Sequence, residues 1–119
     1  MSDTVSVTVE EGELAGRALD DGRSVFAGIP FAEPSVGRLR LRPPRPPRPW
    51  QGVRDATAFR ASPAQNPDAW SPPDAVYDED CLHVNVWTPD VHGRRPVMVW
   101  IYGVAFESGS AVPPGTDGQ

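Results

Sequence analysis

The sequence contains no lysine, because all eleven of its basic residues are arginine. Without lysine the chain can form neither the phosphate-binding Walker motif nor a Schiff-base nucleophile. Its net charge of −5 and its pI of about 4.8 predict repulsion from phosphate backbones and anionic membranes. We therefore expect neither a nucleic acid nor a membrane as a partner.

Cysteine and targeting signals are also scarce. Cys81 is the only cysteine, so no intrachain disulfide can form, and we expect a buried, inert thiol. The N-terminus lacks the basic and apolar regions of a signal peptide, and no apolar run approaches membrane-spanning length. These features predict a cytoplasmic protein.

Catalytic and metal-binding motifs are missing from the 119 residues. None of the eight serines lies in a Gly-x-Ser-x-Gly nucleophile elbow. Cys81, His83 and His92 supply only three donors, and their spacing fits no structural zinc pattern. The consecutive carboxylates Asp78 to Asp80 point to alternating faces if they lie on a strand. We expect no metal, no cofactor and no catalytic residue within this chain.

Proline and glycine, in contrast, are abundant, with fifteen and eleven residues respectively. They argue against long helices and favour short strands joined by irregular segments. Alternating apolar residues from Val5 to Val9, then runs over Leu14–Leu19 and Ser24–Pro30, predict a small antiparallel meander in residues 1–30.

Residues 31–77 form a proline- and arginine-rich segment, with six arginines between positions 38 and 54. We favour a surface loop in which Trp50 anchors the segment to the core. The alternative is a binding module whose polyproline segment is a ligand for SH3-like domains. Two motifs fit that alternative, Arg40-x-x-Pro43-x-x-Pro46 and Pro43-x-x-Pro46-x-Arg48.

Residues 78–109 carry two strand patterns and a turn. Leu82 to Trp87 alternates apolar and other residues, whereas Val97–Ile101 is an unbroken apolar run that predicts a strand buried on both faces. The turn that begins at Tyr102 could direct backbone N–H groups at a developing negative charge. Spacing alone fits an ordinary strand-ending turn equally well. Residues 110–119 form a tail.

Five motifs in order give the chain a resemblance to the type-B carboxylesterases, the α/β-hydrolases related to cholinesterases. They are Gly28-Ile-Pro-Phe-Ala, Gly37-Arg-Leu-Arg, Trp50-Gln-Gly-Val-Arg-Asp-Ala, Glu79-Asp-Cys-Leu-His-Val-Asn-Val-Trp-Thr-Pro and Pro96-Val-Met-Val-Trp-Ile-Tyr-Gly. The resemblance implies an α/β fold, here the N-terminal part of an α/β-hydrolase: the meander, then the first strands of an incomplete central sheet. It also implies hydrolysis of small-molecule esters by a Ser/Glu/His triad, whose members all lie beyond residue 119.

The resemblance identifies an oxyanion loop at Gly103, Val104 and Ala105. In the family a His or Tyr precedes three glycines and an aromatic residue, so Val104 and Ala105 replace the second and third glycines. Both positions keep a backbone N–H donor. Valine, however, resists a positive φ, and its side chain can fill the acyl site.

Two structural roles are also implied by the resemblance. Arg40 and Glu79 match an ion pair that ties the proline-rich loop to the following strand. Cys81 matches a cysteine that is disulfide-bonded in secreted members, but no cysteine occupies the partner position near residues 62–65, so Cys81 should be a free thiol.

We therefore expect the N-terminal fragment of a carboxylesterase, inactive by itself because the triad is absent. A non-functional gene remnant is a further alternative. The Val97–Ile101 strand requires neighbours on both sides, and without them it should expose an apolar sheet edge and make the isolated chain marginally stable or prone to aggregate.

Overall fold

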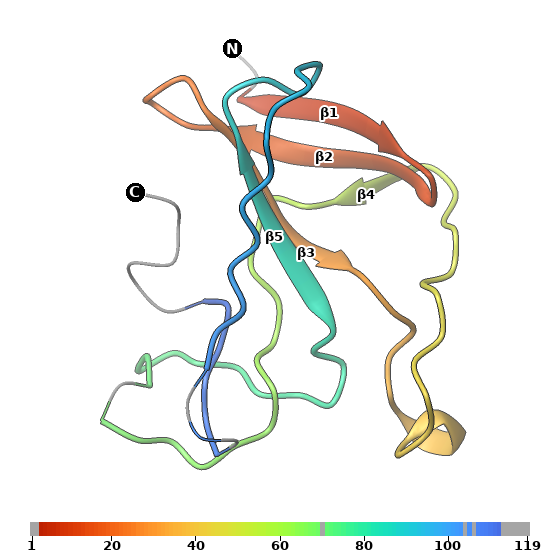
Figure 1. The fold of residues 1–119 in the computed structure, drawn as a ribbon, viewed down its shortest axis with the longest axis vertical. Coiled ribbons are helices and arrows are strands. Elements are labelled where there is room, and N and C mark those ends of the chain that lie inside the picture. Colours follow the sequence, from red (N-terminus) through yellow and green to blue (C-terminus); the bar gives the residue numbers. More distant parts are fainter. Residues whose placement is uncertain (1–2, 70, 104, 106, 113–119) are drawn as a thin grey trace.

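The computed structural model describes residues 3–69, 71–103, 105 and 107–112. These residues form five strands and one turn of 3-10 helix (Figure 1). In chain order they are β1 (Thr4–Val9), β2 (Gly12–Ala18), β3 (Ser24–Pro30), the helical turn η1 (Gly37–Leu39), β4 (Val53–Asp55) and β5 (His83–Thr88). The meander predicted for the first thirty residues is confirmed.

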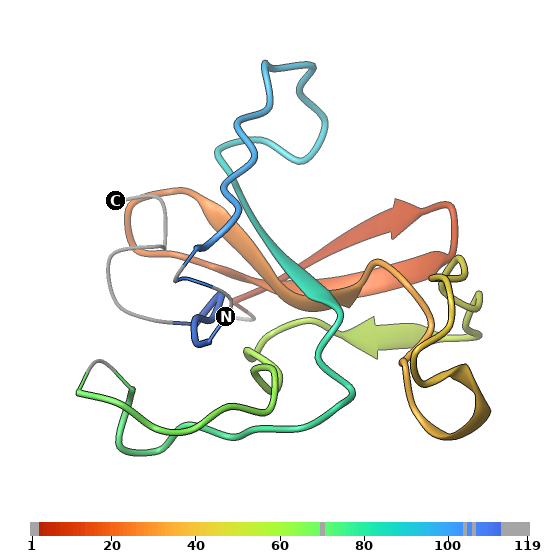
Figure 2. The same cartoon turned by 60° about the horizontal axis from the view of Figure 1, so that its bottom comes forward.

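The strands form one sheet in the order β1-β2-β3-β5, with β4 added in parallel beside β2. β1 and β2 pair antiparallel from Thr4 opposite Arg17 to Val9 opposite Gly12. β3 pairs antiparallel with β2 at its start and with β5 along its length. Figures 1 and 2 both show β3 and β5 side by side. The sheet thus joins the N-terminal meander to a strand more than fifty residues farther along.

A bulge interrupts the pairing of β3 with β5. Their register shifts between Phe26 and Ile29, where Gly28 adopts a φ of +67°. A left-handed conformation is easily adopted by glycine and disfavoured for residues with a Cβ. The bulge leaves the Gly28 N–H without a ladder partner, and a side chain of β5 accepts it instead, as described below.

The core is small and lies against the meander. Leu14, Phe26 and Ala56 form its buried centre. Trp50 packs against them, and its indole Nε1–H donates to the Glu13 carbonyl oxygen at 2.8 Å. A buried indole N–H needs such a partner. Trp50 therefore anchors the end of the proline-rich segment to β2, as predicted.

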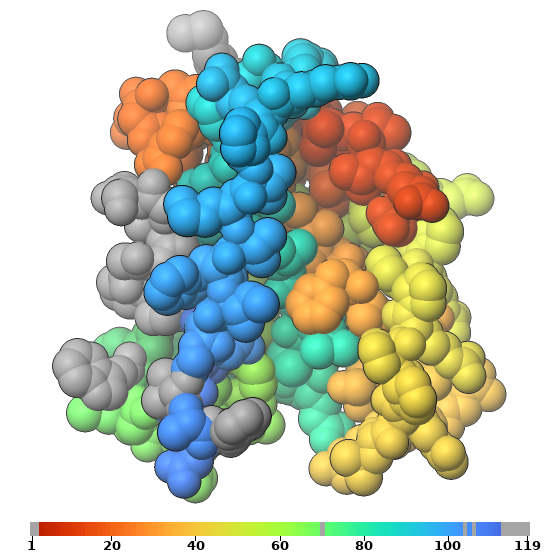
Figure 3. Space-filling view, viewed as in Figure 1, coloured from red at the N-terminus to blue at the C-terminus, as the bar shows by residue number. Residues whose placement is uncertain are grey.

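The predicted strand at Val97–Ile101 is wrong for this chain. These five residues belong to no strand, and each is between 74 and 93% exposed. They run as an extended stretch across the face shown in Figure 3 (blue), and Figure 2 shows this part of the chain standing away from the sheet. A central strand requires hydrogen-bonding neighbours on both sides, and the described residues offer this stretch none.

Candidate functional site

The turn after Ile101 has an unusual backbone. Ala105 adopts a φ of +53°, and Gly109 a φ of +124°. For a residue with a Cβ, the left-handed region costs about 1–2 kcal/mol. Val104, the middle residue of the predicted oxyanion loop, lies outside the described residues, as does Phe106. The two described members, Gly103 and Ala105, are exposed, so their surroundings are open to a ligand.

The turn closes on itself at Gly109. A Cβ placed on Gly109 would lie 2.7 Å from the Gly103 carbonyl oxygen and 2.8 Å from Cδ2 of the Tyr102 ring. Real Cβ atoms do not approach other atoms so closely, and the Gly103 contact is to backbone that cannot easily move. Both its φ and its surroundings therefore require a glycine at position 109, where the backbone passes close to the start of the turn.

Three side chains hold the last residue of the turn and the two residues after it. Gly109 N–H donates to Gln65 Oε1 at 2.8 Å, and Gln65 Nε2 donates to the Gly109 carbonyl oxygen at 2.8 Å. The hydroxyls of Ser62 and Ser110 lie 2.6 Å apart. Asn85 Nδ2 donates to the Ala111 carbonyl oxygen at 3.1 Å. We call Ser62, Gln65 and Asn85 the side-chain clamp.

The clamp is itself fixed to the rest of the fold. Asn85 lies on β5, and its Oδ1 accepts the Gly28 N–H at 2.9 Å, which satisfies the donor freed by the β3 bulge. Ser62 is only 7% exposed, and its backbone bonds to Val76 and to Asp78. The residues that hold the turn therefore belong to two other parts of the molecule.

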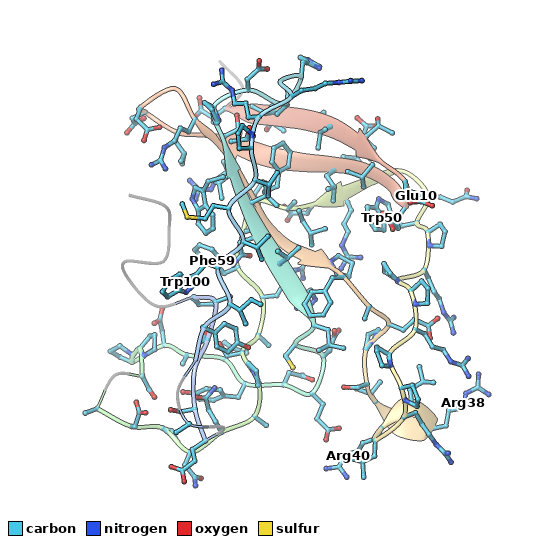
Figure 4. All side chains as sticks on the ribbon, viewed as in Figure 1. Glu10, Arg38, Arg40, Trp50, Phe59 and Trp100 are labelled. Atoms are coloured by element: carbon cyan, nitrogen blue, oxygen red, sulfur yellow. The ribbon has the colours of Figure 1, made fainter. Side chains whose placement is uncertain are left out.

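Arg40 and Glu79 lie together, with Arg40 Nε donating to Glu79 Oε1 at 2.7 Å. The pair joins the loop after η1 to the segment before β5. Both side chains are about half exposed, so solvent screening limits the contribution of the pair to roughly 0–1 kcal/mol. In Figure 4 the side chains of Arg38 and Arg40 project outward from this loop.

Cys81 is a free thiol and is partly buried. Burial raises its pKa, and the carboxylates of Asp80, Asp78 and Glu79 raise it further. The protonated thiol is a poor nucleophile and a poor metal ligand. Among the described residues, no three His, Cys, Asp or Glu side chains form a group that could hold a metal ion, and no helix is long and apolar enough to cross a membrane.

His83 occupies the wall of an open cleft of about 600 Å³. Its side chain is 10% exposed, its Nδ1 has no hydrogen-bond partner, and its Nε2 lies 3.7 Å from Asp80 Oδ1. Burial lowers its pKa below the ordinary 6.5, and the Arg54 and Arg60 guanidiniums lower it further, against an opposing effect of Asp80. The alternation predicted for β5 holds, yet the His83 face is the more buried one, since Val84 and Val86 are each 41% exposed.

We expect His83 to make stability depend on pH. Because its pKa is lower in the folded state, the unfolded chain binds the proton more readily, and the free energy of unfolding should fall as the pH drops through 6.5. Thermal melts between pH 7.5 and 5 would show this, and His83→Gln should flatten the dependence. His92→Gln, at the other histidine, which is exposed, should leave it unchanged. Equal pH dependence in all three proteins would contradict the assignment.

Known proteins resemble this chain in sequence. A model of the Carboxylesterase family matches residues 3–119, nearly the whole chain. The chain belongs to the carboxylesterase family. Phenmedipham hydrolase of Pseudarthrobacter oxydans is 46% identical over 110 residues, which is 87% of this chain. Acetylcholinesterase of Bungarus fasciatus is 40% identical over 128 aligned positions, which is 97% of this chain.

Solved esterase structures have the same fold over this region. A PNB esterase superimposes with a TM-score of 0.86 at 38% identity, and a carboxylesterase of Geobacillus stearothermophilus with 0.83 at 40%, each over 95% of this chain. The fold is therefore part of an α/β-hydrolase, as predicted. The chain spans 22 and 21% of the length of the two curated relatives, and 24 and 22% of the two solved chains.

The proline-rich segment of this carboxylesterase chain has the exposure that an SH3 ligand needs, since Pro43 and Pro46 are exposed. The arginines of its two motifs, however, already contact carboxylates of the same chain. Arg40 bonds to Glu79, and Arg48 Nε donates to Glu33 Oε1 at 2.6 Å. An SH3-like partner would have to displace the ion pair of the arginine in the motif that it binds.

Sequence reasoning did not find the side-chain clamp. Ser62, Gln65 and Asn85 reach backbone or hydroxyl groups 48, 44 and 26 residues away. Polar residues in a proline-rich loop and on the less apolar face of a strand give no periodic signal that would distinguish them from solvated positions. Only the asparagine within the Glu79–Pro89 family motif could have been singled out.

Proposed function

We propose that this chain is the N-terminal part of a carboxylesterase that hydrolyses small-molecule carboxylic esters, and that it supplies the oxyanion turn of that enzyme. The observation that carries the proposal is the left-handed Ala105 in a turn that Gly109 closes. A left-handed residue turns successive backbone N–H groups toward one side, which is the geometry that binds an anionic oxygen.

The chemistry assigned to this turn is stabilisation of negative charge. When a serine attacks an ester carbonyl, the carbonyl oxygen gains charge, and fixed N–H donors lower the energy of that state. Substituting Val104 and Ala105 for glycines leaves the N–H groups in place. The 119 residues hold no nucleophile elbow, so the proposal assigns them a binding role and not the bond-breaking step.

We also propose that the protein is cytoplasmic, as expected from the sequence. This location is supported by the single, protonated thiol of Cys81, which needs no oxidising compartment.

We expect the purified 119-residue chain to show no turnover of a short-chain p-nitrophenyl ester, because it has no activated serine. A hybrid in which residues 3–119 replace the matching segment of the Geobacillus stearothermophilus carboxylesterase should hydrolyse the same ester. Release of p-nitrophenol, with and without a serine-directed organophosphate, measures both.

The two proteins test different parts of the proposal. Organophosphate-sensitive turnover by the 119-residue chain alone would show that it contains a nucleophile we have not found. A hybrid that melts cooperatively but gives no turnover would show that this chain does not supply a working oxyanion turn. The unmodified Geobacillus enzyme is the positive control.

A further inference from the structure

The stretch that follows the oxyanion turn is held almost wholly by side chains. Among the described residues, no backbone-to-backbone hydrogen bond involves Gly109, Ser110 or Ala111. Each is instead contacted by a different member of the side-chain clamp, namely Gln65, Ser62 and Asn85 respectively. Backbone polar groups are usually paired within secondary structure, so a stretch that is held by side chains depends on those three residues.

Gln65 makes the strongest of these contacts because it engages one residue twice. Its amide oxygen accepts the Gly109 N–H, and its amide nitrogen donates to the Gly109 carbonyl oxygen, both at 2.8 Å. The same nitrogen donates to the Pro63 carbonyl oxygen at 2.9 Å, which fixes the rotamer of the side chain. Two antiparallel bonds to one residue restrain both its position and its orientation.

The restraint on Gly109 also restrains the turn. A Cβ on Gly109 would clash with the Gly103 carbonyl oxygen and the Tyr102 ring, so the backbone of Gly109 lies close to both. Fixing Gly109 therefore fixes the distance between the two ends of the turn. Between those ends lies Ala105, with its positive φ. A strained conformation of this kind persists only where contacts with the surrounding structure hold it in place.

We propose that Gln65 is a positioning residue of the oxyanion turn, which holds Ala105 in its left-handed conformation by clamping Gly109 from both sides. This inference rests on the proposed function for its catalytic meaning. Among the described residues, the hydrogen bonds of Gln65 go to Pro63 and Gly109, so its role in the turn is an indirect one. Ser62 and Asn85 extend the same restraint to Ser110 and Ala111 and connect it to the sheet.

Hydrogen exchange on the whole 119-residue chain tests the clamp without any need for hydrolysis. Gln65→Glu keeps the size of the side chain and an acceptor for Gly109 N–H, but it replaces the donor to two carbonyl oxygens with a repelling carboxylate. We expect exchange in peptides covering residues 102–112 to accelerate about tenfold or more. Peptides covering residues 4–18, in β1 and β2, should be unchanged.

The matched control is Gln51→Glu, the same chemical change at an exposed glutamine. It should alter exchange in neither region. Unchanged exchange over residues 102–112 in the Gln65→Glu chain would overturn the proposal. An equal acceleration in residues 4–18 would overturn it as well, since Gln65 would then act on the stability of the whole fold.

A double substitution separates positioning from simple tethering. Ala105→Gly removes the cost of the positive φ, so a turn with glycine at this position should need the clamp less. In that background, we expect Gln65→Glu to accelerate exchange by less than about threefold. The same acceleration with alanine and with glycine would mean that Gln65 does not hold Ala105, and the proposal would be wrong.

The outcome is independent of the proposed function. An inactive hybrid enzyme together with coupled exchange would leave the clamp established and remove its role in catalysis. An active hybrid without coupled exchange would support the proposed function and rule out the clamp.

Discussion

Replacing Gly16 with alanine should unfold the meander. Gly16 lies in β2, opposite Val5, and a Cβ added there would be 2.4 Å from the Val25 carbonyl oxygen and 2.6 Å from Cδ1 of Phe26. The carbonyl belongs to the neighbouring strand, and Phe26 is only 3% exposed, so neither the carbonyl nor the ring can move away from the added Cβ. We expect a loss of about 3 kcal/mol or more in the free energy of unfolding. Far-UV circular dichroism during heating would show it.

The effect should be decisive because the core is small. Only six hydrophobic residues are buried in the part of the chain that the structure describes, and a core of this size leaves little reserve of stability. Ala18→Val is the control, since it adds more volume in the same strand but at an exposed position. Its melting temperature should stay close to that of the parent. If Gly16→Ala melted with the parent, the packing of β2 against β3 would differ from the structure described.

The meander was predictable because the strands that pair in it are neighbours in the sequence. Val5–Val9 alternates and pairs with the segment that follows it after a two-residue turn, so pattern and partner lie close together in sequence. Val97–Ile101 shows the limit of such reasoning. Its apolar run satisfied the pattern of a buried strand, but whether it becomes one depends on neighbours, which no local pattern encodes.

The motif around Gly103 predicted a turn after Ile101, and Ala105 in that turn adopts the positive φ that a glycine would favour. The oxyanion role of this turn stays a proposal. The clamp could not be foreseen, since it pairs Gln65 with a backbone 44 residues away. A glutamine can bond to almost any polar group, so its residue type specifies no partner.

The exposed apolar stretch should dominate the behaviour of the chain in solution. Met98 and Trp100 are 93 and 75% exposed, within an extended segment of five apolar residues. Such a segment, whose backbone has no partner among the described residues, can pair with a second copy of itself. We expect Met98→Glu with Trp100→Glu to raise the concentration at which the chain aggregates by about tenfold. Light scattering across a concentration series would measure it.

The matched control separates the effect of where the charges are added from the effect of how many are added. Leu41 and Val76 are 90 and 67% exposed apolar residues outside the stretch, and Leu41→Glu with Val76→Glu adds the same two charges. If net charge alone governed aggregation, both double variants would gain equally. We expect only the variant in residues 97–101 to gain strongly, with its melting temperature unchanged because these side chains contribute nothing to the core. A gain of the same size in the control would mean that this stretch is not the surface through which copies of the chain associate.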